Sequence, residues 1–249
     1  MTDDRFGEKY FKPDFTNTPS ILKGKKPFYY RFWARYIRKH KGNAIKLLDI
    51  GCGKGFFLEY AERFSEAYGV DISRYAIEKA SQGLRSPKLF IQDATRLGFK
   101  SGYFDVVTCF DILEHLEEPE LTVKECSRLL KERGILVISV PNTHSYGRIW
   151  KKSRWFGYRD SSHVSLLSSE KWIELLEANN FDIVDRFYDG LWDSPYFPVV
   201  PALIQHFFFK IAFTILFPLL GTFDIKLPNK WGENVIVVAH METKWNKMG

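Results

Sequence analysis

Residues 45–55 constrain this chain more than any other stretch. An apolar run of strand type ends at Asp49, three alternating glycines follow, and a helical pattern then covers 56–64. Glycine reaches positive φ and leaves room for a ligand beside the backbone. A strand, a glycine-rich loop and a helix in this order present free backbone N–H groups above the end of a sheet. The stretch therefore predicts a nucleotide-type pocket.

The acids at the ends of three predicted strands indicate which nucleotide fits. Position 56 is Phe, where the dinucleotide fingerprint needs glycine. Asp49 beneath the loop favours a cationic or amine-bearing ligand over a pyrophosphate. Asp71, at the end of the second predicted strand, is placed to accept hydrogen bonds from ribose hydroxyls, and Asp93 with Ala94, at the end of the third, suits an adenine amino group. Together they predict an adenosine ligand that carries an amino group.

The segment Leu-Leu-Asp-Ile-Gly-Cys-Gly-Lys-Gly at 47–55 resembles the first motif of the class I S-adenosylmethionine-dependent methyltransferases. Later segments are similar to the fourth strand of that family (104–109), its fifth strand (135–142) and its closing antiparallel pair (181–187 and 234–240). Phe56 and the Leu-Glu-His-Leu segment at 113–116 disfavour the alternative, a Rossmann-like domain for NAD or flavin.

The resemblance implies an α/β fold, a Rossmann-like, seven-stranded, mostly parallel sheet with an antiparallel last strand and helices on both faces. The apolar composition of the chain between strands six and seven adds the prediction of an apolar helical insertion there, where the core fold needs only a short connection. The resemblance also implies S-adenosyl-L-methionine as the cofactor. The residues that it places at the cofactor are Asp49, Gly51, Cys52, Gly53, Asp71, Ile72, Asp93, Ala94, Phe110 and Asp111.

Length and composition favour a single domain. A chain of 249 residues that is 45% hydrophobic can bury one full core. We expect one methyltransferase domain over 1–249, with a helical cap at 1–44, the core sheet at 45–188 and 233–243, and the apolar insertion at 189–232.

Charge and cysteine usage point to a cytoplasmic protein. The three cysteines have spacings unlike any metal pattern, so we predict buried thiols in a reducing compartment and no metal site. The polar, acidic N-terminus predicts no signal peptide. A net charge of +6 is modest; it suits an anionic substrate or membrane surface without requiring either.

Basic residues gather in two places. Residues 28–37 carry apolar side chains at helical spacing and predict an amphipathic helix whose basic face either is solvated or binds a partner. Residues 146–159 mix basic and aromatic side chains in one loop. In the resembled family this position lies over the methyl donor, so we interpret the loop as a substrate lid, with plain surface packing as the alternative.

Two histidines are candidate general bases. His163 ends an Asp-x-x-His segment that is similar to one facing the acceptor in small-molecule members of the family. His115 follows the fourth strand and competes for the role. An imidazole titrates near neutral pH, as a base for an oxygen acceptor requires. For either residue, a structural histidine is the alternative.

The apolar stretch 197–220 is the most unusual part of the chain. Its prolines and Lys210 argue against a transmembrane span. An interfacial membrane helix, a lid for an apolar substrate, a homodimer interface and ordinary core packing all remain open.

We therefore expect in-line methyl transfer to a small, apolar or lipid-linked acceptor, mainly by alignment of the reactants. The alternatives are an RNA methyltransferase, which the 146–159 loop permits, and a non-catalytic cofactor-binding module that docks to a membrane or partner through 197–220. The expected location is the cytoplasm, with peripheral contact to a membrane as an open extension.

Overall fold

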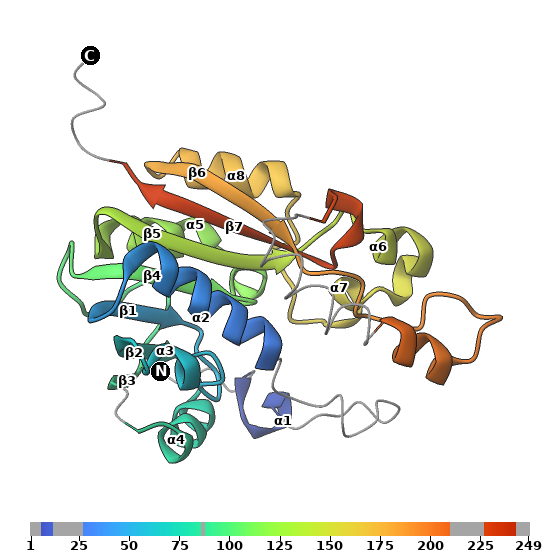
Figure 1. Ribbon diagram of the computed structural model, residues 1–249, viewed down its shortest axis with the longest axis horizontal. Coiled ribbons are helices and arrows are strands. Elements are labelled where there is room, and N and C mark those ends of the chain that lie inside the picture. Colours follow the sequence, from blue (N-terminus) through green and yellow to red (C-terminus); the bar gives the residue numbers. More distant parts are fainter. Residues whose placement is uncertain (1–5, 12–26, 86–87, 210–226, 243–249) are drawn as a thin grey trace.

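Seven strands form one sheet in the order β3-β2-β1-β4-β5-β7-β6 (Figure 1). The computed structural model describes residues 6–11, 27–85, 88–209 and 227–242. β7 runs antiparallel to both β5 and β6, and the remaining pairs are parallel, as the sequence predicts. The strands are β1 (Ile45–Ile50), β2 (Ser65–Asp71), β3 (Lys88–Ile91), β4 (Phe104–Phe110), β5 (Leu130–Pro141), β6 (Phe181–Tyr188) and β7 (Asn234–Met241).

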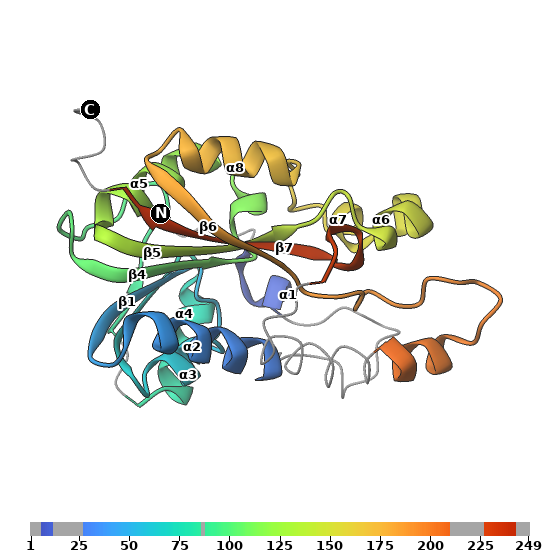
Figure 2. The same ribbon diagram turned by 45° about the horizontal axis from the view of Figure 1, so that its top comes forward.

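Helices cover both faces of this sheet (Figure 2). One face carries α2 (Pro27–Lys41), α3 (Leu58–Ala61) and α4 (Arg74–Gly83), and the other carries α5 (Pro119–Leu129) and α8 (Ser169–Glu177). Because successive strand residues point to opposite faces, Leu47 joins the core under α2 whereas its neighbour Leu48 joins the core under α5 and α8. The strands therefore read as continuous apolar runs, which is typical of a sheet buried on both sides.

The amphipathic helix predicted at 28–37 is α2. Trp33 and Ile37 are fully buried against the sheet, whereas Arg31, Arg35 and Arg38 are exposed. The helix therefore packs on the domain with a solvated basic face.

Of three helices that the sequence predicts, the one after Ser168 begins as expected, the one expected at 121–130 instead spans Pro119–Leu129, and the one at 56–64 is shorter. Ser168 caps α8 by accepting a hydrogen bond from the N–H of Lys171. Pro119 occupies the first turn of α5, where its missing N–H costs nothing. The pattern at 56–64 yields only one helical turn, α3, because the chain must already enter β2 at Ser65. All three cysteines are buried free thiols, as predicted.

The carboxyl ends of the parallel strands meet at one edge of the sheet, where the chain order reverses between β1 and β4. Ligands of open α/β sheets bind at such a switch point. Short elements gather at this edge, on the right in Figure 1. They are α1 (Glu8–Phe11), η3 (Leu113–His115), α6 (Tyr146–Lys151), η4 (Lys152–Arg154), α7 (Phe156–Arg159) and η5 (Asn229–Trp231).

The segment between β6 and β7 is only partly described. Residues 202–209 are helical, and the rest of the predicted apolar stretch, from 210 to 220, lies outside the described residues. Among the described helices, none combines the length and the apolarity that a membrane crossing needs. The division of the chain into cap, core and insertion stays a prediction.

Candidate active site

The glycine loop turns tightly at the end of β1. Gly51, Gly53 and Gly55 have φ of 71°, 52° and 77°, a conformation that other residues adopt at a cost. A Cβ on Gly51 would lie 2.5 Å from the side chain of Ile112, so the loop packs directly against the segment that follows β4. The N–H groups of Gly51 and Cys52 both donate to the carbonyl of Val70, which fixes the loop to β2.

Asp71 holds the same loop from the tip of β2. Its Oδ2 accepts the N–H of Gly53 at 2.9 Å and its Oδ1 accepts the N–H of Ser73 at 2.8 Å. Burial raises the pKa of this carboxyl, and the backbone donors oppose the rise. Each carboxylate oxygen has a second lone pair, so Asp71 retains the capacity to accept a ligand hydroxyl.

Asp49 is buried beneath the loop, where the sequence places it. Only 3% of the residue is exposed, and its Oδ1 accepts a 2.6 Å hydrogen bond from Thr108 Oγ1. Burial raises its pKa to about 7, partly opposed by this hydroxyl. The group therefore titrates near neutral pH, and a cation bound above it would favour the charged form.

The remaining predicted cofactor residues lie around the same edge. Cys52 is buried and Ile72 is half-buried, and Asp93 is exposed with Thr95 bonded to its Oδ1. Ala94 is buried in the core. The ring of Phe110 belongs to the core under α2, with its centroid 4.9 Å from that of Phe57. Asp111, at φ 54°, accepts from Ser139 Oγ and Asn234 Nδ2.

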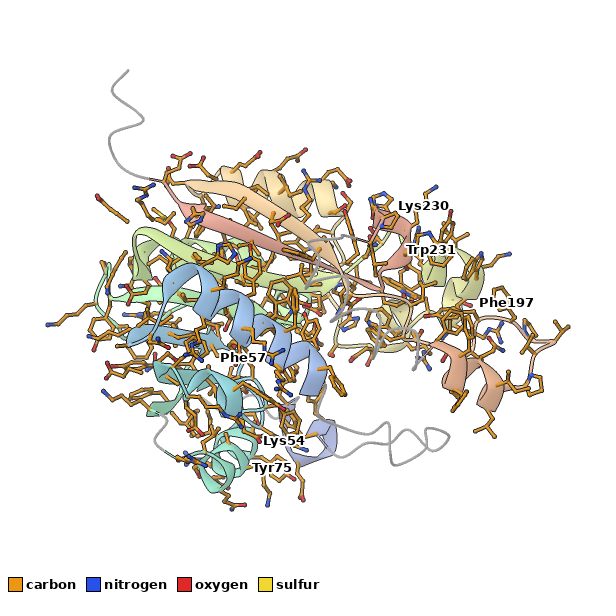
Figure 3. All side chains as sticks on the ribbon, viewed as in Figure 1. Lys54, Phe57, Tyr75, Phe197, Lys230 and Trp231 are labelled. Atoms are coloured by element: carbon orange, nitrogen blue, oxygen red, sulfur yellow. The ribbon has the colours of Figure 1, made fainter. Side chains whose placement is uncertain are left out.

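Helix α1 lies over the glycine loop, a contact that the predicted helical cap at 1–44 does not specify. Lys54 Nζ donates a 2.9 Å hydrogen bond to the carbonyl of Phe11, whose ring lies 6.1 Å from that of Tyr75. Lys54 and Tyr75 lie side by side next to α1 in Figure 3. The segment also reaches the predicted catalytic residues, because Tyr10 Oη lies 3.4 Å from His115 Nε2.

The two predicted catalytic histidines lie together. The ring centroids of His115 and His163 are 4.7 Å apart. His163 Nδ1 bonds to the carbonyl of Gly157 at 2.9 Å, and its Nε2 is 3.8 Å from Asp160 Oδ2. Burial, and then the proximity of His163, lowers the pKa of His115. The structure thus brings both histidines to one point beside the loop, without distinguishing between their predicted roles.

Glu114 lies beside this histidine pair, although the sequence pattern did not single it out. It is 2% exposed, and a potential ligand atom from each of Glu114, His115 and His163 lies within 4.8 Å of the other two. The Glu-His dipeptide on a short turn after β4 is the one signal in the sequence that could have suggested this cluster.

The predicted lid, 146–159, is anchored by two buried carboxylates. Glu233 accepts hydrogen bonds from Ser145 Oγ, Trp155 Nε1 and Tyr196 Oη. Asp193 pairs with Lys151 and, at 2.7 Å, with Arg159.

Arg148 also bonds within the loop, to Tyr158 Oη and the carbonyl of Thr143. Three of the five basic residues that mark this loop, Arg148, Lys151 and Arg159, are therefore held by intramolecular partners, whereas Lys152 and Arg154 are exposed.

An aromatic run connects this lid to the start of the apolar stretch. Ring centroids are 5.4 Å apart for Trp231 and Tyr146, 5.1 Å for Tyr146 and Trp150, and 5.1 Å for Trp150 and Phe197. Figure 3 shows Phe197 and Trp231 on either side of α6. Both are about two-fifths exposed, so the run continues onto the surface.

The helix over 202–209 has inverted polarity. Gln205 is 4% exposed and bonds to the backbone of Tyr196, Phe197 and Val200, while His206 Nδ1 lies 2.7 Å from Ser194 Oγ. The polar residues thus face the protein. The apolar ones face outward, and we call the exposed set Val199, Leu203, Ile204, Phe207 and Phe208 the apolar patch.

A groove at the other edge of the sheet is separate from this site. It measures ≈ 490 Å³, lies at the amino end of β2 between α3 and α4, and has Glu59, Glu62, Arg63 and Arg85 in its walls. Since the glycine loop follows the carboxyl end of β1, this charged groove takes no part in the site.

Comparison with known proteins agrees with this geometry. Residues 26–186 match the family model of the methyltransferase domain. A ubiquinone biosynthesis O-methyltransferase of Azoarcus sp. (strain BH72) is 35% identical over 114 residues, which cover 43% of this chain and 49% of that protein. The chain therefore spans about half the length of the curated relatives that it matches.

Solved structures share the fold. A methyltransferase of Haloferax volcanii, solved with the Trm112 methyltransferase activator, has a TM-score of 0.62 at 15% identity and covers 86% of this chain and 90% of that one. The magnesium protoporphyrin IX methyltransferase of Synechocystis PCC 6803, solved with bound SAH, has a TM-score of 0.58 at 17% identity and covers 86% and 82%.

Proposed function

The chain belongs to the methyltransferase-domain family, and we propose that it transfers a methyl group from S-adenosyl-L-methionine to an oxygen of a small, apolar or lipid-linked acceptor. The family and the acid-tipped strands support the donor. The O-methyltransferase name of the curated relatives supports the acceptor atom.

The donor supplies a methyl group already activated on a sulfonium, so the protein needs chiefly to bind and align. Asp71 retains lone pairs that ribose hydroxyls could use, and Asp93 is exposed just after β3, where we propose that it meets the adenine amino group. Asp49 beneath them adds negative charge that a cationic ligand favours. These residues fit the donor, and their individual roles are proposals.

On the acceptor side we assign the reactive position to the pair His115 and His163. The pair lies beside the glycine loop and under the Tyr10 hydroxyl, so it reaches an acceptor placed over the loop. A neutral imidazole there is suited to take the proton of an acceptor hydroxyl. His163→Ala should spare donor binding and lower turnover.

The inverted helix at 202–209 is the observation that carries the apolar character of the acceptor. Leu203 is 75% exposed and Phe207 69%, while Gln205 faces inward. A surface of this kind is typical of contact with lipid or another apolar partner. Because the aromatic run leads from this patch to the lid, we propose that an acceptor held in a membrane passes along it toward the histidines, with the protein bound peripherally.

The two alternative functions predict different behaviour. An RNA methyltransferase needs cations free to meet phosphates, and Lys151 and Arg159 are instead paired with Asp193. A non-catalytic module would bind donor and vesicles and transfer no methyl group. A homodimer through the apolar patch would bury the same residues without lipid.

Incubation with radiolabelled donor and separate lipid, RNA and protein fractions tests the proposal. We expect label in the lipid fraction as an alkali-stable methyl ether. Label confined to RNA, or vesicle binding with no label in any fraction, would overturn it in favour of the corresponding alternative.

A further inference from the structure

Glu114, His115 and His163 form a cluster that could bind a metal ion as well as act as a general base. One potential ligand atom from each lies within 4.8 Å of the other two. Two imidazoles and a carboxylate are a common ligand set for divalent transition-metal ions, with open positions left for a substrate.

Hydrogen bonds hold the two segments of this cluster together. The N–H groups of Val164 and Ser165 both donate to the carbonyl of Glu114, each at 2.9 Å. Ser165 Oγ also donates a 2.6 Å hydrogen bond to the carbonyl of Leu116, in the same turn. The turn that carries Glu114 and His115 is therefore fastened to the residue that follows His163, and the three ligands approach from two rigidly joined segments.

Each histidine is also oriented as a ligand. A carbonyl oxygen can only accept, so His163 Nδ1, at 2.9 Å from the carbonyl of Gly157, carries the proton. His115 Nδ1 is 3.3 Å from the carbonyl of Ser162 and 2.9 Å from Ser162 Oγ, whose own hydroxyl donates to Asp160. Both rings thus keep Nε2 as the lone-pair nitrogen. Anchoring of the second nitrogen in this way is the usual outer shell of a metal-bound histidine.

Negative charge gathers around the same point. Asp160 Oδ2 lies 3.8 Å from His163 Nε2, and the carboxyl group of Glu114, which is 2% exposed, lies beside both histidines. Two carboxyl groups therefore lie close to the two imidazoles. A divalent cation at this point would offset their charge.

We propose that Glu114, His115 and His163 bind one divalent transition-metal ion, which positions the acceptor oxygen for methylation. The binding stands on the geometry alone, and its role in positioning rests on the proposed function. With both Nε2 atoms on the ion, neither imidazole takes the acceptor proton, and the ion replaces that role because it lowers the pKa of a hydroxyl that it holds. The acceptor O–H bond then breaks with its proton going to solvent water, the oxygen pair forms the new O–CH₃ bond, and the C–S bond breaks with its pair going to the sulfur.

Calorimetric titration of the chelator-treated full chain with Mn²⁺ and with Zn²⁺ tests the site directly. We expect one equivalent to bind, and a Co²⁺ titration to give visible absorption bands of a nitrogen and oxygen ligand set. Glu114→Gln and His163→Ala should each weaken binding at least about tenfold. His240→Ala is the matched control, since His240 lies on β7 at the opposite edge of the sheet, and it should bind as the wild type does.

The outcomes separate this inference from the proposed function. Binding of less than one equivalent by the wild type, or equal binding by the two ligand variants, would overturn the metal site whether or not methylation occurs. If Glu114→Gln shows no thermal unfolding transition and is therefore unfolded, metal binding by His163→Ala, on the half-buried loop, is compared with that of the wild type instead. Specific binding of one ion without label in any acceptor fraction would instead leave the site standing and refute the proposed acceptor. Methylation that survives removal of all metal would refute the positioning role.

Discussion

The indole Nε1 of Trp155 donates a 2.7 Å hydrogen bond to Oε2 of Glu233, 78 residues further along the chain. Trp155 and Glu233 are both fully buried. The same carboxylate accepts from Ser145 Oγ and Tyr196 Oη, so one side chain joins the lid, the start of the apolar stretch and the entry to β7.

Glu233→Ala should therefore destabilise the fold strongly. It leaves three buried donors without an acceptor, and each such group costs about 1–3 kcal/mol, so we expect a loss of about 3 kcal/mol or more in the free energy of unfolding. Glu233→Gln keeps an acceptor oxygen and should lose less. Urea denaturation measures both, with the exposed Glu132→Ala as the control. Equal stability of Glu233→Ala and Glu132→Ala would contradict the joining role.

Asp71→Ala should weaken binding of S-adenosyl-L-methionine by about 2–4 kcal/mol, because the loop N–H of Gly53 loses its acceptor together with the proposed ribose partner. Calorimetry measures the affinity. Asp182→Ala, an exposed acid on β6, is the control. An unchanged dissociation constant in Asp71→Ala would remove this residue from the donor site.

Asp49 should make stability depend on pH in a predictable direction. Its folded pKa of about 7 exceeds the ordinary 3.8. Between these values the folded chain holds a proton that the unfolded chain has released, so the free energy of unfolding falls as pH rises through this window. Asp49→Asn removes this loss and keeps an oxygen for Thr108. Its stability relative to wild type should rise between pH 5 and pH 8, by up to about 3 kcal/mol. A difference that is constant with pH would refute the buried titration.

The apolar patch should mediate vesicle binding. Leu203→Asp combined with Phe207→Asp removes two exposed apolar side chains, each worth about 1.5–3 kcal/mol when buried in an apolar medium. Co-sedimentation with vesicles of phosphatidylcholine and phosphatidylglycerol should drop more than tenfold. Stability should stay within about 0.5 kcal/mol, as for other surface changes.

Val184→Asp provides the matched control, because Val184 is 50% exposed on β6. If the double variant sediments with vesicles as wild type does, the patch is no lipid surface. A dimer that dissociates in the double variant would assign the patch to a second copy of the chain.

Local patterns predict the sheet well in this chain. The apolar runs that end at Asp49, Asp71 and Asp93 mark β1, β2 and β3, since periodicity and the strand ends are both properties of neighbouring residues. The order of the strands and the antiparallel β7 follow from the family resemblance. The strand order also predicts the edge of the sheet at which the cofactor binds, because parallel strands place their carboxyl ends together.

The same local patterns do not predict contacts between residues that are distant in the sequence. Three contacts each join segments that lie tens of residues apart in the sequence. They are the hydrogen bond between Trp155 and Glu233, the packing of α1 over the glycine loop, and the approach of Glu114 to His163. Sequence spacing carries no information on such distances. The inward turn of Gln205 is a further case, because a helical wheel separates two faces without saying which one meets the protein.

The position of α1 has a consequence for the order of events in turnover. Its Phe11 carbonyl is bonded to Lys54 on the glycine loop, and its Tyr10 reaches His115. Exchange of a ligand above the loop therefore requires α1 to move, and its return rebuilds the surroundings of the histidines. We expect ordered kinetics in which the donor enters first and S-adenosylhomocysteine leaves last. That product should then inhibit competitively against the donor and non-competitively against the acceptor.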